Sequence, residues 1–209
     1  MYVVFLAGGI ASGKSTVAHE LELAGARRID LDQLSRQVLE PGTPTTLAVA
    51  DAFGRDLLDP TTGMLNRGLL ARRAFASPEA AAQLEAIELP AITQLLANTL
   101  DEAAHDGNAP ACCVVEVPLL DRVQDMDQLA DEVVVVCAPM AERRVRAIAR
   151  GMDGNDFDAR VANQPSDEWL RAHADTILEN DGTAEELASL VRCWWASREA
   201  AGWPARKGK

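Results

Sequence analysis

Apolar and polar positions along the chain follow two different periods, one typical of buried strands and one of amphipathic helices. The first apolar run, Tyr2–Ala7, is rich in β-branched residues and ends at two glycines, which predicts a short buried strand. The next segment, Lys14–Leu23, has apolar residues at helical spacing and closes before Gly25. A strand, a glycine-rich loop and a helix therefore follow one another, as at the start of an α/β unit.

The same strand pattern recurs later in the chain, each time followed by a helical pattern. Four further strands are predicted, at Arg28–Leu31, Cys112–Val117, Glu132–Cys137 and Thr176–Leu178. Strands that alternate with helices favour a parallel sheet covered on both faces. We therefore expect an α/β fold with a five-stranded parallel sheet flanked by helices.

The interval 33–109 shows helical patterns only. They are Thr45–Phe53, Arg67–Phe75 and Pro78–Ala103, and Pro90 is expected to kink or split the last of these. A chain of 209 residues can bury one sizeable core. We predict a single domain 1–209, with a core at about 1–32 and 110–201 and a helical lobe inserted at about 33–109.

Composition and charge narrow the choice of partners and location. Hydrophobic residues make up 48% and charged residues 25%, which is typical of a globular protein, and the net charge of −12 repels a polyanion such as nucleic acid. The four cysteines show no metal-ligand or disulfide spacing and are expected to be small buried residues. Neither a signal peptide nor a membrane span is apparent. These features predict a cytoplasmic protein without a membrane or nucleic-acid partner.

The glycine-rich loop fits the pattern G-x-x-x-x-G-K-[ST] in the required strand–loop–helix context. Its residues are Gly8, Gly9, Ile10, Ala11, Ser12, Gly13, Lys14 and Ser15, followed by Thr16. Backbone N–H groups of such a loop surround an anion, Lys14 reaches the β- and γ-phosphates of ATP, and the Ser15 hydroxyl holds Mg²⁺. The alternative is a glycine-rich turn that binds nothing. No Asn-Lys-x-Asp run or nucleic-acid motif is present, so a small-molecule acceptor is the better choice.

Two carboxylates stand at the end of the second predicted strand, where open α/β sheets form their ligand crevice. Asp32 is expected to accept the proton of an attacking hydroxyl and to help position the metal. The alternative is that Asp30 or Asp32 caps the helix that follows, and for Asp30 we favour that structural role.

A cluster of arginines lies on the helical pattern that starts at Met140. Arg146 and Arg150 are four residues apart and share a face, from which they could neutralise charge on a transferring phosphoryl group. For Arg143 and Arg144 we favour the alternative over a role in neutralising phosphoryl charge. The alternative is a solvated basic face paired with neighbouring acids, namely Glu142, Asp153 and Asp156.

Together these motifs resemble the dephospho-coenzyme A kinases over roughly residues 1–195. The landmarks, in the order of that family, are Leu6–Thr16, Ile29–Asp32 with Arg36, Pro41–Pro44, Phe53-Gly54, Gly63–Arg67, Pro118–Leu120, Arg146–Arg150, Gln164 and Ala174–Asn180. The resemblance implies a P-loop fold with a helical acceptor-binding lobe and a mobile lid at about 140–165. It implies transfer of the γ-phosphoryl group of ATP to the ribose 3′-hydroxyl of dephospho-coenzyme A, the last step of coenzyme A synthesis.

Residue roles follow from the same resemblance. Asp32 matches the family's proposed catalytic base and Lys14 its phosphate lysine, while Asn180 is expected near the adenine of ATP, with a plain turn as the alternative. Arg36 and Arg67 are candidate contacts to the acceptor's phosphates, because guanidinium forks suit phosphate oxygens, and each could equally be a surface ion-pair partner. A monomer or weak homo-oligomer is expected.

Two positions depart from the family pattern. Leu89 stands where the family usually has histidine before proline, and Arg122 stands where it usually has glutamate. Other readings therefore remain open: a P-loop kinase with a nucleoside monophosphate or sugar-acid acceptor, or an ATP-binding regulatory module that has lost catalysis.

Overall fold

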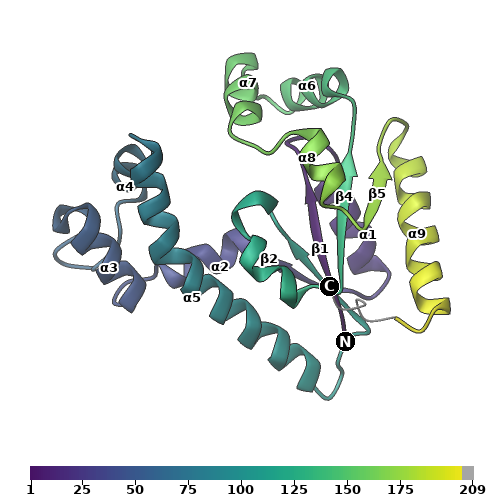
Figure 1. Cartoon of the computed structure of the whole chain (residues 1–209), viewed down its shortest axis with the longest axis horizontal. Helices are drawn as coiled ribbons and strands as arrows, with labels where there is room; N and C mark the ends of the chain where they lie inside the picture. The colour runs from purple at the N-terminus through teal and green to yellow at the C-terminus, as the bar shows by residue number, and fades with distance from the viewer. Residues whose placement is uncertain (204–209) are drawn as a thin grey trace. The chain divides into compact units, whose positions relative to one another are not determined.

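The computed structural model describes residues 1–203, apart from the side chains of residues 124, 125 and 127. Its sheet has the strand order β2-β3-β1-β4-β5, and every neighbouring pair is parallel (Figure 1). The strands are β1 (Tyr2–Gly8), β2 (Arg27–Asp30), β3 (Cys112–Glu116), β4 (Glu132–Cys137) and β5 (Thr176–Glu179). The predicted class, a five-stranded parallel sheet flanked by helices, is confirmed.

The three central strands form the core of this sheet. Every residue of β1, β3 and β4 is buried, which is why their sequences are continuous apolar runs and do not alternate. The edge strands β2 and β5 each expose part of their length. The prediction for the second strand, Arg28–Leu31, began and ended one residue too late, because the buried Leu31 is already the first residue of the helix that follows.

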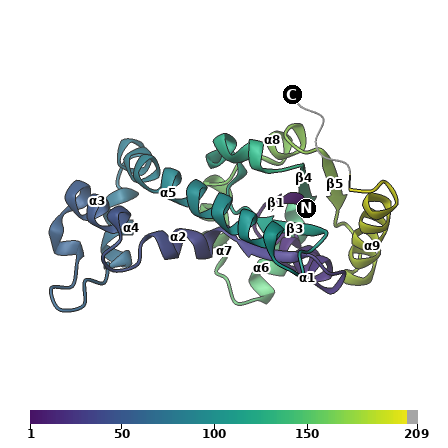
Figure 2. The same ribbon diagram turned by 90° about the horizontal axis from the view of Figure 1, so that it is seen from below.

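Helices flank the sheet in the same unit. They are α1 (Lys14–Leu23), α6 (Met140–Ala149), α7 (Gly154–Ala162), α8 (Asp167–Ala172) and α9 (Ala184–Ala200). Both views show α9 beside β5, and it also packs against α1 (Figure 2). A capping box starts α9, since Thr183 and Glu186 each accept the backbone N–H of the other.

The chain divides into two compact units, Met1–Asp30 with the residues from Ala103 onward, and Leu31–Glu102. The second unit is helical, with α2 (Leu31–Val38), α3 (Pro44–Phe53), α4 (Arg67–Ala74) and most of α5 (Pro78–His105). Side-chain oxygens of Thr43 and Asn66 cap α3 and α4.

Pro90 does not split α5, so that part of the prediction is wrong. The helix continues for 28 residues through the proline. Buried side chains lie on both sides of it, at Leu84 before the proline and at Ile92, Leu96 and Leu100 after it. Burial of apolar side chains on both sides of Pro90 thus outweighs the hydrogen bond that a proline removes.

Three of the four cysteines are buried, as expected, and burial raises the pKa of Cys112 to about 12. Cys193 is the exception, because it is exposed. On α9 the buried positions include Leu187, Val191 and Trp194, and Cys193 falls outside that stripe.

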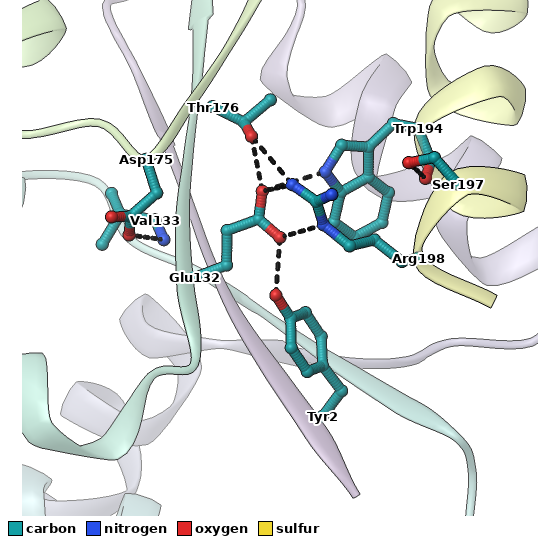
Figure 3. Close-up of polar contacts among 8 residues, drawn as sticks. All are labelled: Tyr2, Glu132, Val133, Asp175, Thr176, Trp194, Ser197 and Arg198. Atoms are coloured by element: carbon teal, nitrogen blue, oxygen red, sulfur yellow. Dashed lines mark hydrogen bonds and ion pairs between the residues drawn. The ribbon is translucent and has the colours of Figure 1, made fainter. Parts of the chain in front are cut away.

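A buried carboxylate joins the amino ends of three strands (Figure 3). Glu132, the first residue of β4, is 2% exposed and accepts hydrogen bonds from Tyr2 Oη at 2.7 Å, Thr176 Oγ1 at 2.5 Å and Trp194 Nε1 at 3.1 Å. Arg198, near the end of α9, adds two more from Nε at 2.7 Å and Nη2 at 2.6 Å. Burial alone would raise the pKa of Glu132, but these donors outweigh it and the pKa is lowered.

Glu132→Gln is expected to destabilise the fold by roughly 3 kcal/mol at pH 7, because it leaves Arg198 without its charged partner. A carboxyl whose pKa is lowered by folding stabilises the folded state at pH values above its unfolded pKa of about 4.3. That stabilisation is lost as the pH falls through the folded pKa. The difference in the free energy of unfolding between variant and parent, measured in urea, should therefore shrink at acid pH. An equal difference at pH 7 and pH 3 would contradict the ionised network.

Candidate active site

The phosphate loop lies between the end of β1 and the start of α1, as its sequence pattern predicts. Gly13 is the N-cap of α1 with φ at +106°, and a side chain there would overlap Asn180 Nδ2, so glycine is required. Lys14, Ser15 and Thr16 form the first turn of the helix. The N–H groups of a first helical turn have no intrahelical i−4 partner, and they make a ready anion site at the positive end of the helix.

Three side chains hold the backbone of this loop. Arg143 of α6 donates from Nε to the Ile10 carbonyl at 2.9 Å, and Gln164, two residues after α7, accepts the Ile10 N–H at 2.8 Å. Asn180, after β5, donates from Nδ2 to the Ser12 carbonyl at 2.7 Å. Arg143 is 2% exposed and is also paired with Asp167 at 2.7 Å. The loop is thus anchored from three separate segments.

The phosphate lysine belongs to a chain of charges. Lys14 Nζ lies 3.8 Å from Glu116 Oε2, at the carboxyl end of β3, and Glu116 is 6% exposed. Arg28 of β2 donates from Nε to Glu116 Oε1 at 2.5 Å and also contacts Glu22 at 3.2 Å. Burial alone would lower the pKa of Arg28, but the hydrogen bond and charge of Glu116 raise it. Arg28 is therefore held in its charged form between Glu116 and Glu22.

The arginines of α6 separate into different roles. Arg146 Nη2 donates to Glu142 at 2.8 Å and to the Asn180 carbonyl at 3.2 Å, which brings it to the side of the phosphate loop. Arg144 pairs with Asp158 and lies over the ring of Phe157. Arg150 follows the end of α6 and is exposed.

Two buried polar atoms near the loop have no hydrogen-bond partner within residues 1–203. They are Ser12 Oγ in the loop itself and Arg146 Nη1. Buried donors are almost always satisfied in native proteins, so each one points to a group that binds there.

The predicted acceptor-side residues lie in the second unit. Asp32 is exposed in the first turn of α2, and Arg36 is exposed in the same helix. Arg67, which begins α4, donates from Nη2 to the Arg36 carbonyl at 3.1 Å, so these two arginines are brought together. Burial raises the pKa of Glu88 on α5 to about 7, with a smaller lowering by Arg67 and a raising by Glu85.

The residues at the loop suit Mg²⁺ held largely by phosphate oxygens. Within the described part of the chain, no cluster of three or more histidine, cysteine, aspartate or glutamate side chains forms a metal cage. Magnesium ions commonly keep their waters and bind through one or two protein oxygens and the substrate phosphates. The hydroxyl of Ser15 and the carboxylate of Glu116 are oxygen ligands of that kind.

Sequence reasoning had not assigned the contacts of Arg143 and Asn180 with the loop, nor Arg28 as a partner of Glu116. Helical spacing could have placed Arg143 on the face of Arg146 and Arg150, since the three lie at i, i+3 and i+7. Gln164 appeared only as a landmark without a role. Nothing local distinguishes Arg28, because its partner is 88 residues away.

A phosphate loop at the head of a helix, set in a five-stranded parallel sheet with a helical second unit, defines the P-loop kinases. The chain belongs, more particularly, to the dephospho-CoA kinase family, whose model matches residues 2–186. Curated relatives named dephospho-CoA kinase include one from Corynebacterium diphtheriae, 42% identical, covering 93% of this chain and 96% of the relative. Another, from Anaeromyxobacter dehalogenans, is 43% identical and covers 90% of this chain and 88% of the relative.

Solved structures agree on the fold. TT1252 from Thermus thermophilus is 31% identical, with a TM-score of 0.77 over 94% of this chain and 97% of that one. A dephospho-CoA kinase from Campylobacter jejuni, 21% identical with a TM-score of 0.70 and covering 96% and 98% of the two chains, shows the likeness of fold alone. The chain is therefore a kinase, and ATP is the substrate that membership of this family implies.

Glu88→Gln tests the raised pKa of Glu88. A carboxyl whose folded pKa is raised contributes stability below its unfolded pKa, and that contribution is lost as pH rises through about 7. The variant cannot ionise, so it should gain about 1–2 kcal/mol relative to the parent between pH 5 and pH 8 in chemical denaturation. Glu102→Gln, an exposed change on the same helix, should show no such gain. A pH-independent difference for Glu88→Gln would contradict the raised pKa.

Proposed function

We propose that this kinase transfers the γ-phosphoryl group of ATP to the ribose 3′-hydroxyl of dephospho-coenzyme A, giving coenzyme A and ADP. Membership of the dephospho-CoA kinase family over residues 2–186 is the observation that carries the proposal. The structure adds a phosphate loop whose backbone is anchored on several sides. This reaction is the last step of coenzyme A synthesis.

The chemistry requires positioning and charge stabilisation more than covalent help. The acceptor oxygen forms a bond to the γ-phosphorus, the bond to the β–γ bridging oxygen breaks, and Asp32 takes the hydroxyl proton. The Lys14 side chain and the backbone N–H groups of Lys14 and Ser15 stabilise charge on the β- and γ-phosphates. Arg146 and Arg150 supply further positive charge from the lid segment at about 140–165.

Mg²⁺ is proposed as the cofactor. When bound, it would neutralise charge on the β- and γ-phosphate oxygens, and the Ser15 hydroxyl would be its protein ligand. Glu116, already held by Arg28 and close to Lys14, could contact its water shell.

Adenine is proposed to lie near Asn180. A surface pocket opens there between the turn after β5 and the start of α9, and its lining includes Glu179, Asn180, Asp181, Gly182 and Leu187. Arg146 contacts the Asn180 carbonyl, so the base and the triphosphate would be held by neighbouring groups.

The acceptor is proposed to bind through the helical unit. The Arg67 guanidinium lies against the backbone of Arg36. We propose that both guanidiniums donate to phosphate oxygens of dephospho-coenzyme A. Leu89 removes the polar side chain that the family pattern has at this point, and Arg122 reverses a charge. We expect both to affect the affinity for the acceptor and to leave the phosphate loop unchanged.

Location and assembly follow from the same proposal. No helix among residues 1–203 is both long and apolar enough to cross a membrane. A cytoplasmic enzyme with small-molecule substrates, without nucleic-acid partners and acting as a monomer or weak homo-oligomer, fits the acidic charge of −12.

ADP release measured with several acceptors tests the assignment. With dephospho-coenzyme A, the turnover rate should be at least about 100-fold higher than with nucleoside monophosphates or gluconate at the same concentration. Dephospho-coenzyme A alone among these matches the acceptor of the family. Phosphorus NMR of the product should show a new 3′-phosphomonoester. Turnover with gluconate but not with dephospho-coenzyme A would overturn the proposal.

Asp32→Asn should keep MgATP affinity within about threefold and lower kcat by roughly 10²–10⁴, because the amide cannot accept the proton. Asp30→Asn, two residues earlier, is the matched comparison, and its kcat should fall far less. Full activity in Asp32→Asn would remove this residue from the mechanism.

Lys14→Ala should weaken MgATP binding itself, which calorimetric titration would reveal.

A further inference from the structure

One residue of the phosphate loop has a backbone conformation that its side chain disfavours. Ala11 has φ at +58°, in the left-handed region, and it is not a glycine. For a residue with a Cβ, this region is less populated by about tenfold than the right-handed one. Such a conformation persists only where surrounding contacts impose it.

Ala11 is the third residue of a turn that the Ser12 N–H closes by donating to the Gly9 carbonyl at 3.1 Å. Three side chains hold the peptide groups on either side of it. The Ile10 peptide group is held at its N–H by Gln164 Oε1 and at its carbonyl by Arg143 Nε. The Ser12 carbonyl is held by Asn180 Nδ2. Residues on both sides of the left-handed position are therefore fixed by side chains more than 130 positions away in sequence.

Fixing these groups bears directly on anion binding. A carbonyl dipole turned toward a triphosphate repels it, whereas an N–H turned toward it attracts. With the carbonyls of Ile10 and Ser12 accepting from Arg143 and Asn180, neither oxygen is free to turn toward the anion. With the Ile10 N–H donating to Gln164, that donor is also outside the anion site.

We propose that Gln164 is a positioning residue for ATP, which acts with Arg143 and Asn180 to hold Ala11 in its left-handed conformation and thereby orients the phosphate loop. The inference rests on the proposed function for the identity of the nucleotide as ATP. Gln164 does not touch the reacting atoms; it acts through the Ile10 peptide. A glutamine is suited to this position, because its side-chain amide accepts the hydrogen bond from the Ile10 N–H without adding a negative charge near the triphosphate.

Two substitutions separate the hydrogen bond from the charge. Gln164→Met keeps the length and volume of the side chain but removes the acceptor. Gln164→Glu keeps an acceptor but adds a charge. Asn163→Met is the matched control, because the neighbouring amide is exposed and donates to the Ala159 carbonyl of its own helix at 2.8 Å.

MgATP affinity, measured by calorimetric titration of the full chain, is the main readout. Gln164→Met should bind MgATP about tenfold more weakly than Asn163→Met, as expected for loss of one hydrogen bond that orders the site. Gln164→Glu should also lose affinity, but its loss should shrink when salt is raised from 0.05 to 0.5 M, because it comes from charge repulsion. KM for the acceptor should be unchanged in both.

Ala11→Gly supplies the rescue that a general loss of stability would not show. Glycine adopts the left-handed conformation without the Cβ penalty. In the Ala11→Gly background, Gln164→Met should therefore lose at most about threefold in MgATP affinity. Circular dichroism and thermal unfolding would establish that each variant is folded.

Two results would overturn the proposal: equal MgATP affinity of Gln164→Met and Asn163→Met, or a loss that Ala11→Gly leaves undiminished. If Gln164→Met failed to fold, Gln164→Glu would decide, since a salt-independent loss in that variant contradicts the proposed geometry. Failure of the parent to phosphorylate dephospho-coenzyme A would refute the acceptor assignment, while the MgATP titrations would still test the role of Gln164.

Discussion

A backbone loop can bind a triphosphate only if its N–H groups face the anion while its carbonyl oxygens are held elsewhere. In this kinase the carbonyls of Ile10 and Ser12 accept from Arg143 and Asn180, and this arrangement constrains the rest of the unit. α6 must lie where its buried arginine reaches the loop, and the turn after β5 must present Asn180. The parallel sheet satisfies both demands, because the carboxyl ends of β1, β4 and β5 meet at one edge.

The two ends of the sheet carry different kinds of charge. At the carboxyl end, Lys14, Glu116 and Arg28 form a chain of ion pairs that is partly open to solvent. At the amino end, Glu132 of β4 is almost fully buried and accepts hydrogen bonds from two neighbouring strands, β1 and β5, and from α9. In the first arrangement Lys14 is partly exposed and only 3.8 Å from one partner, Glu116, so its positive charge is available to a ligand. In the second, the charge of Glu132 is neutralised by Arg198, and the hydrogen bonds hold α9 against β1, β4 and β5.

Sequence reasoning succeeded wherever a local pattern decides the structure. β1, α1 and β4 follow from continuous apolar runs and helical spacing, and the phosphate loop follows from its glycines. It failed where tertiary burial overrides local preference, as at Pro90 within α5 and at Leu31 after β2. It also could not find the partners of Ile10 or Glu116, because those contacts join residues 88 to 154 positions apart. The placement of Asp32 relative to ATP remains a prediction.

The distance in sequence between the loop and its partners has a consequence for synthesis on the ribosome. The loop emerges among the first fifteen residues, whereas Arg143, Gln164 and Asn180 emerge in the last third of the chain. The neighbouring strands β3 and β4 also follow more than one hundred residues later. A nascent chain therefore carries the nucleotide motif long before the side chains that orient it are made, and the loop can take its final conformation only after Asn180 has emerged.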